Sequence, residues 1–338
     1  MQLLFPFFCN RATLKQIEPY ERVIALKIAM IGSGAAGSVF AAYLKRGGAD
    51  LYLVDRYEAH MKQVRENGLL LREGEKETLL TGFHTTDSAK KLETMDVVIL
   101  MVKCTQTKSV MPEVMHCIGE HTVVVSLQNG LDNHEILSEF VPDDRLILGF
   151  GKIGTELPAP AVCVTRPEPG TAMYFGAVKK SELTDAVGKQ LEAYFLAGGC
   201  QAEFVEDIRP YIWRKGISNC GYNTVCAVLG LPVGAVLRNE QGRELIRQVW
   251  TECCDVAEAL GIGRFHEEMD AEEQKLLEGF SEYYPSMAQD VIKQRQTEIM
   301  HMNGVISRYG RELGVPTNAN NVLTTQICTI QSNYPAKR

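Results

Sequence analysis

Residues 26–37 read Leu26-Lys-Ile-Ala-Met-Ile31 followed by Gly32-Ser-Gly34-Ala-Ala-Gly37. The mostly apolar run predicts a buried parallel strand, and the pattern that resumes over residues 39–45 predicts a helix after the glycines. In such a loop the first glycine allows a tight turn, the second lets the backbone approach a pyrophosphate, and the third lets helix and strand pack closely. Free N–H groups at the helix start then bind phosphate. The stretch predicts a dinucleotide site, with these cofactor contacts: Gly32, Ser33, Gly34, Ala35, Ala36 and Gly37.

The next predicted strand, residues 50–55, ends where such a sheet meets the adenosine ribose of the dinucleotide. Two residues there favour different cofactors. Asp55 can accept hydrogen bonds from the free ribose 2′-OH of NAD(H), whereas Arg56 can pair with the 2′-phosphate of NADP(H). We expect both side chains at the cofactor site, and the two residues leave the choice of cofactor open.

Further apolar runs predict the rest of the sheet. Residues 96–102 and 122–126 are expected strands, followed by Lys103 and by Gln128-Asn129-Gly130 respectively. Doubly wound sheets bind ligands beyond the carboxyl ends of their strands, so Lys103 and Asn129 are functional candidates. Additional strands are expected at 161–165, 172–176 and 201–205, with helices at 107–118, 132–140 and 181–197.

The bulk composition excludes several classes of protein. A length of 338 residues predicts two domains, because a single core rarely grows past roughly 250–300 residues. With a net charge of −7 the protein would not be attracted to the negative phosphates of a nucleic acid, so a nucleic-acid-binding protein is not expected. Ten scattered cysteines predict reduced thiols and no metal site. No apolar run reaches the roughly 20 residues that span a bilayer, so we expect a cytoplasmic protein without a membrane partner.

Helical patterns replace strand patterns after Glu206. Helices are expected at 208–229, 240–260, 271–279, 286–313 and 318–332. The predicted architecture is an α/β Rossmann-type N-terminal domain followed by an all-α C-terminal domain. Its expected parts are an N-terminal extension at residues 1–25, a dinucleotide-binding domain at 26–206, and a helical substrate and dimerisation domain at 207–338.

One predicted helix carries a cation and two amides on a single face. Lys215, Asn219 and Asn223 are each four residues apart, a spacing that stacks side chains one helical turn above another. A later segment adds a hydroxyl and two carboxylates at helical spacings: Ser286, Asp290 and Glu298. Because these groups follow a nucleotide-binding half, they predict an active site.

The order of these motifs resembles the ketopantoate reductase (2-dehydropantoate 2-reductase) family. The resemblance covers about residues 26–330. It rests on the glycine loop, Lys103 after a strand, Asn129-Gly130, Trp213-Arg-Lys215 with Asn219 and Asn223, Ser286-Met-x-Gln-Asp290, Thr297-Glu298-Ile and Asn303-Gly304. It implies a Rossmann domain, a helical domain and a cleft between them in which NADPH reduces a 2-keto acid.

The resemblance also implies roles for individual residues. Lys215 looks like the family's general acid and Glu298 like its acidic partner. Arg56 matches the residue that favours NADP(H), while Asp290 matches a recurrent acid whose role the resemblance leaves open. The matching substrate-binding positions are Asn219, Asn223, Ser286 and Asn129, and Lys103 and Asn129 line the cofactor side of the cleft.

The implied activity is reduction of ketopantoate to pantoate in pantothenate biosynthesis, with a small-molecule 2-keto acid as the partner. Residues 283–290 are also similar to NAD-dependent D-2-hydroxyacid dehydrogenases such as D-mandelate dehydrogenase, which is the alternative. A third hypothesis, a non-catalytic redox sensor that binds a dinucleotide, is disfavoured because a sensor needs no proton donor such as Lys215. Helical domains of this family often form homodimers, so the resemblance makes a homodimer possible, while the sequence itself does not fix the oligomeric state.

Overall fold

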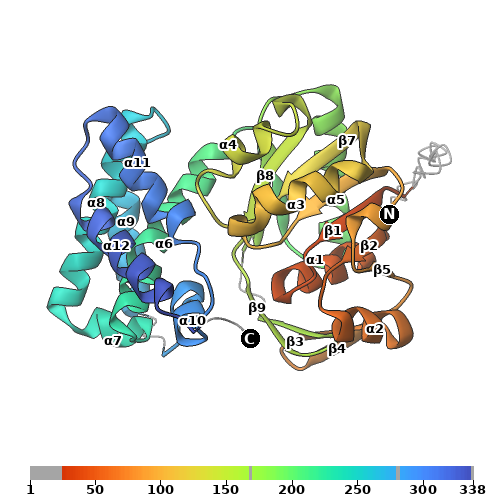
Figure 1. Cartoon of the computed structure of the whole chain (residues 1–338), viewed down its shortest axis with the longest axis horizontal. Helices are drawn as coiled ribbons and strands as arrows, with labels where there is room; N and C mark the ends of the chain where they lie inside the picture. Colours follow the sequence, from red (N-terminus) through yellow and green to blue (C-terminus); the bar gives the residue numbers. More distant parts are fainter. Residues whose placement is uncertain (1–24, 167–169, 279–281, 336–338) are drawn as a thin grey trace, which may run out of the picture.

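The computed structural model describes residues 25–166, 170–278 and 282–335. The strands gather in one lobe and helices α7 to α12 in the other (Figure 1). The change from strands to helices falls between β12 (Ala202–Phe204) and α6 (Arg209–Leu229). The domain boundary itself stays a prediction, and the predicted N-terminal extension lies outside the described residues apart from Ala25.

Within the described ranges, eight strands form the main sheet. In spatial order they are β12, β11 (Met173–Ala177), β8 (Leu146–Gly151), β7 (Ile118–Ser126), β6 (Met95–Leu100), β1 (Lys27–Ile31), β2 (Asp50–Val54) and β5 (His84–Thr86). The pairing is parallel except between β8 and β11. The strand order reverses between β1 and β6, which is the point where doubly wound sheets bind ligands.

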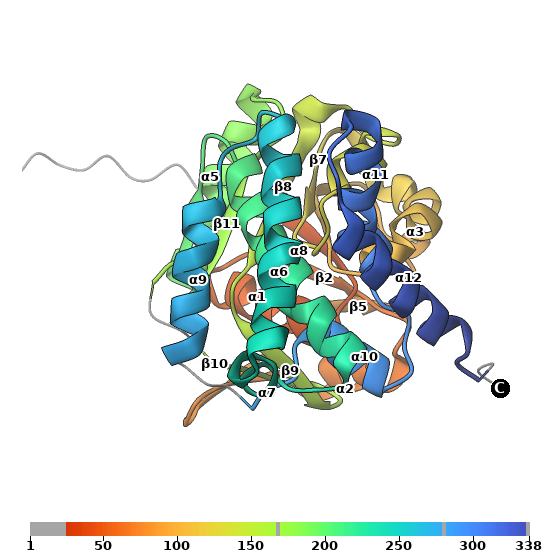
Figure 2. The same ribbon diagram turned by 90° about the vertical axis from the view of Figure 1, so that its left-hand side faces the viewer.

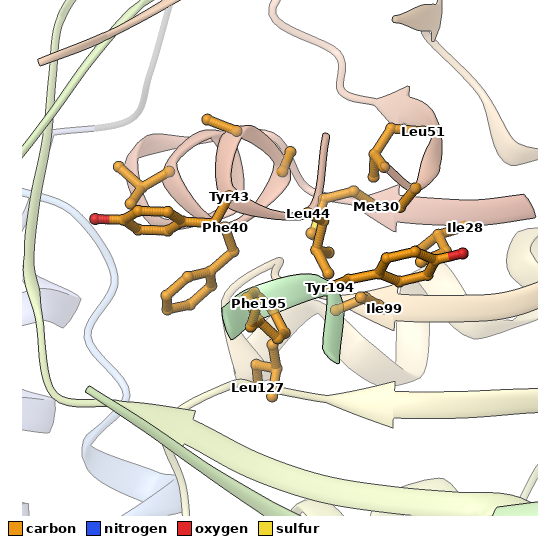
Figure 3. Close-up of a cluster of buried hydrophobic side chains, with 14 of the residues drawn as sticks. Ile28, Met30, Phe40, Tyr43, Leu44, Leu51, Ile99, Leu127, Tyr194 and Phe195 are labelled. Carbon is orange, nitrogen blue, oxygen red and sulfur yellow. The ribbon is translucent and has the colours of Figure 1, made fainter. Parts of the chain in front are cut away.

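Alternate residues of β1 enter different cores, because successive strand side chains point to opposite faces. Ile28 and Met30 pack with α1 (Ala35–Arg46) and α5 (Glu182–Ala197), whereas Ala29 and Ile31 pack with α3 (Thr107–Val114) and α4 (Asn133–Ser138). The first of these cores includes a Phe40–Phe195 edge-to-face pair with ring centroids 6.3 Å apart (Figure 3). Each fully buried side chain of this kind contributes about 1.5–3 kcal/mol.

A second sheet of β4 (Lys76–Leu80), β3 (Leu69–Glu73), β10 (Val162–Arg166) and β9 (Gly154–Ala159) packs against α1. Only the β10 segment of this sheet was predicted from the sequence, and α2 (Glu58–Asn67) was not predicted. β4 and β9 are largely exposed and lack the apolar runs of the main sheet, and β3 has only three apolar residues, Leu69–Leu71, before Arg72.

The second lobe is built around α6, which packs against α8 (Glu240–Ala259), α10 (Ser286–Ile292) and α12 (Asn318–Ser332). Figure 2 shows α6 beside α8, with α9 (His266–Glu278) on one flank. A Cβ on Gly221 would lie 2.1 Å from Trp250 Nε1, so this glycine lets α6 and α8 approach closely. The remaining helices are α7 (Val233–Arg238) and α11 (Asn303–Leu313).

The single helix predicted over residues 286–313 was wrong. The chain leaves α10 after Ile292, takes a positive φ of 50° at Gln294, and forms a 3₁₀ turn over Ile299–His301 before α11. Residues 292–296 are exposed and offer no apolar face to bury, so tertiary packing does not hold them helical. Glu298 is therefore positioned by a loop, not by the helical face that carries Asp290.

Candidate active site

The glycine-rich loop has the geometry that its sequence predicts. Gly32 adopts φ of 95°, and a Cβ there would lie 2.6 Å from the backbone nitrogen of Val102. A Cβ on Gly37 would lie 2.0 Å from the carbonyl oxygen of Gly32. Around Gly34, in contrast, a Cβ would meet no atom of the described residues within 4 Å. Gly32 and Gly37 thus serve close packing, and the space beside Gly34 is open; a phosphate contact at Gly34 stays a prediction.

The two residues at the end of β2 have different surroundings. The Asp55 carboxylate accepts hydrogen bonds from the backbone N–H groups of Ser33, at 2.7 Å, and Tyr57, at 2.8 Å. It therefore fixes the glycine-rich loop to the start of α2. The Arg56 side chain is 85% exposed and lies 3.7 Å from the Glu113 carboxylate. Its guanidinium is thus available at the sheet edge.

Lys215 reaches from α6 to the carboxyl edge of the main sheet. Its Nζ donates hydrogen bonds to Asn129 Oδ1 at 3.1 Å and to the carbonyl oxygen of Gly151 at 2.7 Å. The ammonium also lies 5.0 Å from the ring centroid of Phe150. Burial lowers the pKa of Lys215 to about 8; the Glu298 carboxylate opposes this shift and the Lys152 ammonium adds to it. The ammonium is thus able to give up a proton near neutral pH.

The two asparagines of the Lys215 face are buried. Asn219 accepts a hydrogen bond from the Tyr222 hydroxyl at 3.2 Å. It shares a small cavity with Lys215, Asn129 and Met302. One turn further, Asn223 Oδ1 has no hydrogen-bond partner among the described residues. An unpaired buried acceptor costs free energy.

A charged network joins the lobes. Lys103, which follows β6, lies 2.7 Å from Asp290 Oδ2 and 3.6 Å from Glu298 Oε2. Burial lowers the pKa of Lys103, but the two carboxylates outweigh it and the pKa lies above its ordinary value. Arg295 pairs with the other oxygen of Asp290 at 2.7 Å. Asp290 is thus a buried carboxylate with one cation near each of its oxygens.

The structure brings the predicted residues to one edge in separate groups. Lys215 contacts Asn129, whereas Glu298 contacts Lys103 and Cys104. Ser286 begins α10 and is exposed. The catalytic, substrate and cofactor roles of all of these residues stay predictions.

Two residues at this edge were not predicted from the sequence. Cys104 contacts Glu298 Oε1 at 3.1 Å through both its backbone N–H and its thiol. His301 Nδ1 lies 3.0 Å from both oxygens of Asp132. The signals that could have identified them are their positions: Cys104 directly follows Lys103, and His301 lies three residues after Glu298. Neither residue belongs to a recognisable motif.

In the parts of the chain that the structure describes, no cluster of His, Cys, Asp and Glu is suited to hold a metal ion. Across the same residues, no helix has both the length and the apolar character needed to cross a membrane.

Two family models match the chain, "Ketopantoate reductase PanE/ApbA" over residues 28–180 and "Ketopantoate reductase PanE/ApbA C terminal" over residues 207–331. The 2-dehydropantoate 2-reductase of Aquifex aeolicus is 27% identical over 311 residues, covering 90% of this chain and 96% of the relative. The Streptococcus pyogenes enzyme of that name is 26% identical over 291 residues, covering 85% and 92%. A solved PanE/ApbA family ketopantoate reductase from Ralstonia eutropha has a TM-score of 0.81 at 26% identity. A solved structure of D-mandelate dehydrogenase with NADH and anilino(oxo)acetate has a TM-score of 0.82 at 27% identity. Both of these matches cover 91% of this chain and 99% of the solved chain.

Proposed function

The chain belongs to the ketopantoate reductase family, and we propose that it is a 2-dehydropantoate 2-reductase that uses NADPH to reduce ketopantoate to pantoate. The observation that carries the proposal is Lys215: a half-buried lysine with a pKa of about 8, whose ammonium is held at the carboxyl edge of a dinucleotide-binding sheet. A general acid works best when its pKa lies near the operating pH.

A nicotinamide cofactor held by the glycine-rich loop would supply the hydride for the keto carbon. Negative charge then develops on the keto oxygen, where Lys215 stabilises it and donates a proton. For this step the Lys215 ammonium exchanges one of its contacts with Asn129 or Gly151 for the substrate oxygen. Both contacts lie at the sheet edge and hold the ammonium there before the substrate arrives.

The remaining polar groups orient the substrate. Glu298 accepts a hydrogen bond from the substrate, and Asn219 and Ser286 bind its carboxylate and other oxygens. Asn223, one turn beyond Asn219 on the same face of α6, is a further amide that we expect to contribute to substrate binding.

The surroundings of Asp55 and Arg56 support NADPH as the cofactor. Both Asp55 oxygens already accept backbone hydrogen bonds, while the exposed Arg56 guanidinium can pair with a 2′-phosphate. We expect Arg56→Ala to raise KM for NADPH by about tenfold or more, the loss of one charge-assisted contact of about 1.5–3 kcal/mol, and to leave KM for NADH nearly unchanged. Equal losses for the two cofactors would show that Arg56 does not bind the 2′-phosphate.

The alternative is an NADH-dependent D-2-hydroxyacid dehydrogenase, favoured by the similarity to D-mandelate dehydrogenase. Oxidation of NADPH and of NADH by the purified protein, each with ketopantoate and with phenylglyoxylate, decides between them. We expect turnover with NADPH and ketopantoate. Activity confined to NADH and phenylglyoxylate would establish the alternative and make Asp55 the ribose contact.

A further inference from the structure

Glu298 is held by one neighbouring residue through two donors. Its side chain is 8% exposed, and its Oε1 accepts the Cys104 backbone N–H at 3.1 Å. The Cys104 Sγ lies at the same 3.1 Å from this oxygen. Oε1 is thus engaged by the lobe that carries the main sheet, and Oε2 is the oxygen that lies near Lys103.

The direction of the thiol contact follows from the surrounding groups. Burial raises the pKa of the Cys104 thiol far above its ordinary value, and the Glu298 carboxylate adds to this shift. Because Oε1 already accepts the backbone N–H, it acts as an acceptor. The neutral thiol therefore donates its proton to Oε1.

We propose that Cys104 is a positioning residue, whose thiol fixes the Glu298 carboxylate so that Oε2 faces Lys103 and the substrate. The inference rests on the proposed function, in which Glu298 accepts a hydrogen bond from the keto acid. The loop that carries Glu298 has exposed residues on its N-terminal side, and the contact with Cys104 therefore orients a side chain that no long helix orients.

The test compares Cys104→Ala, which removes the donor, with Cys104→Ser, which keeps one. Cys117→Ala is the matched control, because Cys117 is equally buried and donates to the Val114 carbonyl oxygen at 3.1 Å, away from Glu298. A hydrogen bond to a charged group predicts a loss in kcat of about tenfold for Cys104→Ala. We expect Cys104→Ser and Cys117→Ala to stay within about threefold of the parent.

A comparison of KM with kcat separates orientation from mere stability. A Glu298 carboxylate that Cys104 no longer orients should bind the keto acid less well, so KM for the keto acid should rise in Cys104→Ala, with the Kd for NADPH unchanged. An unmoved KM in Cys104→Ala, or equal effects in Cys104→Ala and Cys117→Ala, would overturn the proposal.

A spectroscopic readout keeps the test independent of turnover. The S–H stretching band of Cys104, assigned by its loss in Cys104→Ala, should shift toward the frequency of a weakly bonded thiol in Glu298→Gln. A band that Glu298→Gln leaves in place would show that the thiol does not donate to this carboxylate. A parent protein that reduces neither keto acid would refute the proposed function, while this band would still decide the contact.

Discussion

At the scale of one residue, the pKa of Lys215 predicts the alkaline limit of activity. Reduction requires the protonated ammonium, so kcat/KM should fall as pH rises through about 8. Lys215→Ala should lower kcat by about 10²–10⁴-fold and abolish this limb. The measurement is initial velocity between pH 6 and 10, with Lys180→Ala as a control because Lys180 is exposed and pairs with Asp185 on the surface. A parent profile that stays flat across pH 8, or a Lys215→Ala variant that keeps the limb, would remove Lys215 from the proton-transfer step.

At the scale of one element, the glycine-rich loop predicts that one alanine substitution weakens cofactor binding and that another lowers stability. A Cβ on Gly34 meets open space, whereas one on Gly37 would collide with the Gly32 carbonyl. Gly34→Ala should fold with its thermal midpoint near that of the parent and bind NADPH at least about tenfold more weakly, because the methyl group occupies the phosphate approach. Gly37→Ala should lower the free energy of unfolding by about 1–3 kcal/mol, and the thermal midpoint should fall accordingly. The idea fails if Gly34→Ala binds NADPH as tightly as the parent.

The elements also show what the sequence can predict. Apolar runs specify β1 and β6, and apolar residues at helical spacing specify α5, because the residues that are buried set both patterns. Three strands of the second sheet were not predicted, because β4 and β9 keep largely exposed side chains and β3 has only three apolar residues before Arg72. At the site, the spacing of Lys215 and Asn219 along α6 is local and readable. The contact of Cys104 with Glu298 joins residues 194 positions apart, and no local pattern records it.

At the scale of the whole molecule, the His301–Asp132 pair predicts how the stability of the two-lobed protein depends on pH. The pair joins the loop after β7 to the turn before α11, and the Leu131 N–H also donates to the His301 carbonyl oxygen at 2.9 Å. Burial lowers the pKa of His301, but the Asp132 carboxylate, aided by Glu298 and opposed by Lys108, raises it above 6.5. A raised pKa in the folded state means that the folded protein binds the proton more tightly than the unfolded chain. The stabilisation is therefore complete below pH 6.5 and is lost as pH rises through the folded pKa.

We accordingly expect His301→Asn to lower the free energy of unfolding more at pH 6 than at pH 9, with a loss of about 1–2 kcal/mol at the lower pH. The matched control is His266→Asn, because His266 lies 3.0 Å from Asp255 in a half-exposed pair, and a solvated pair contributes less. Thermal unfolding of parent and variants at both pH values gives the result, and groups that titrate in all three proteins cancel in the difference. Equal losses for His301→Asn at the two pH values would mean that the pair stabilises the lobes through packing alone, and that protonation of His301 has no part in holding them together.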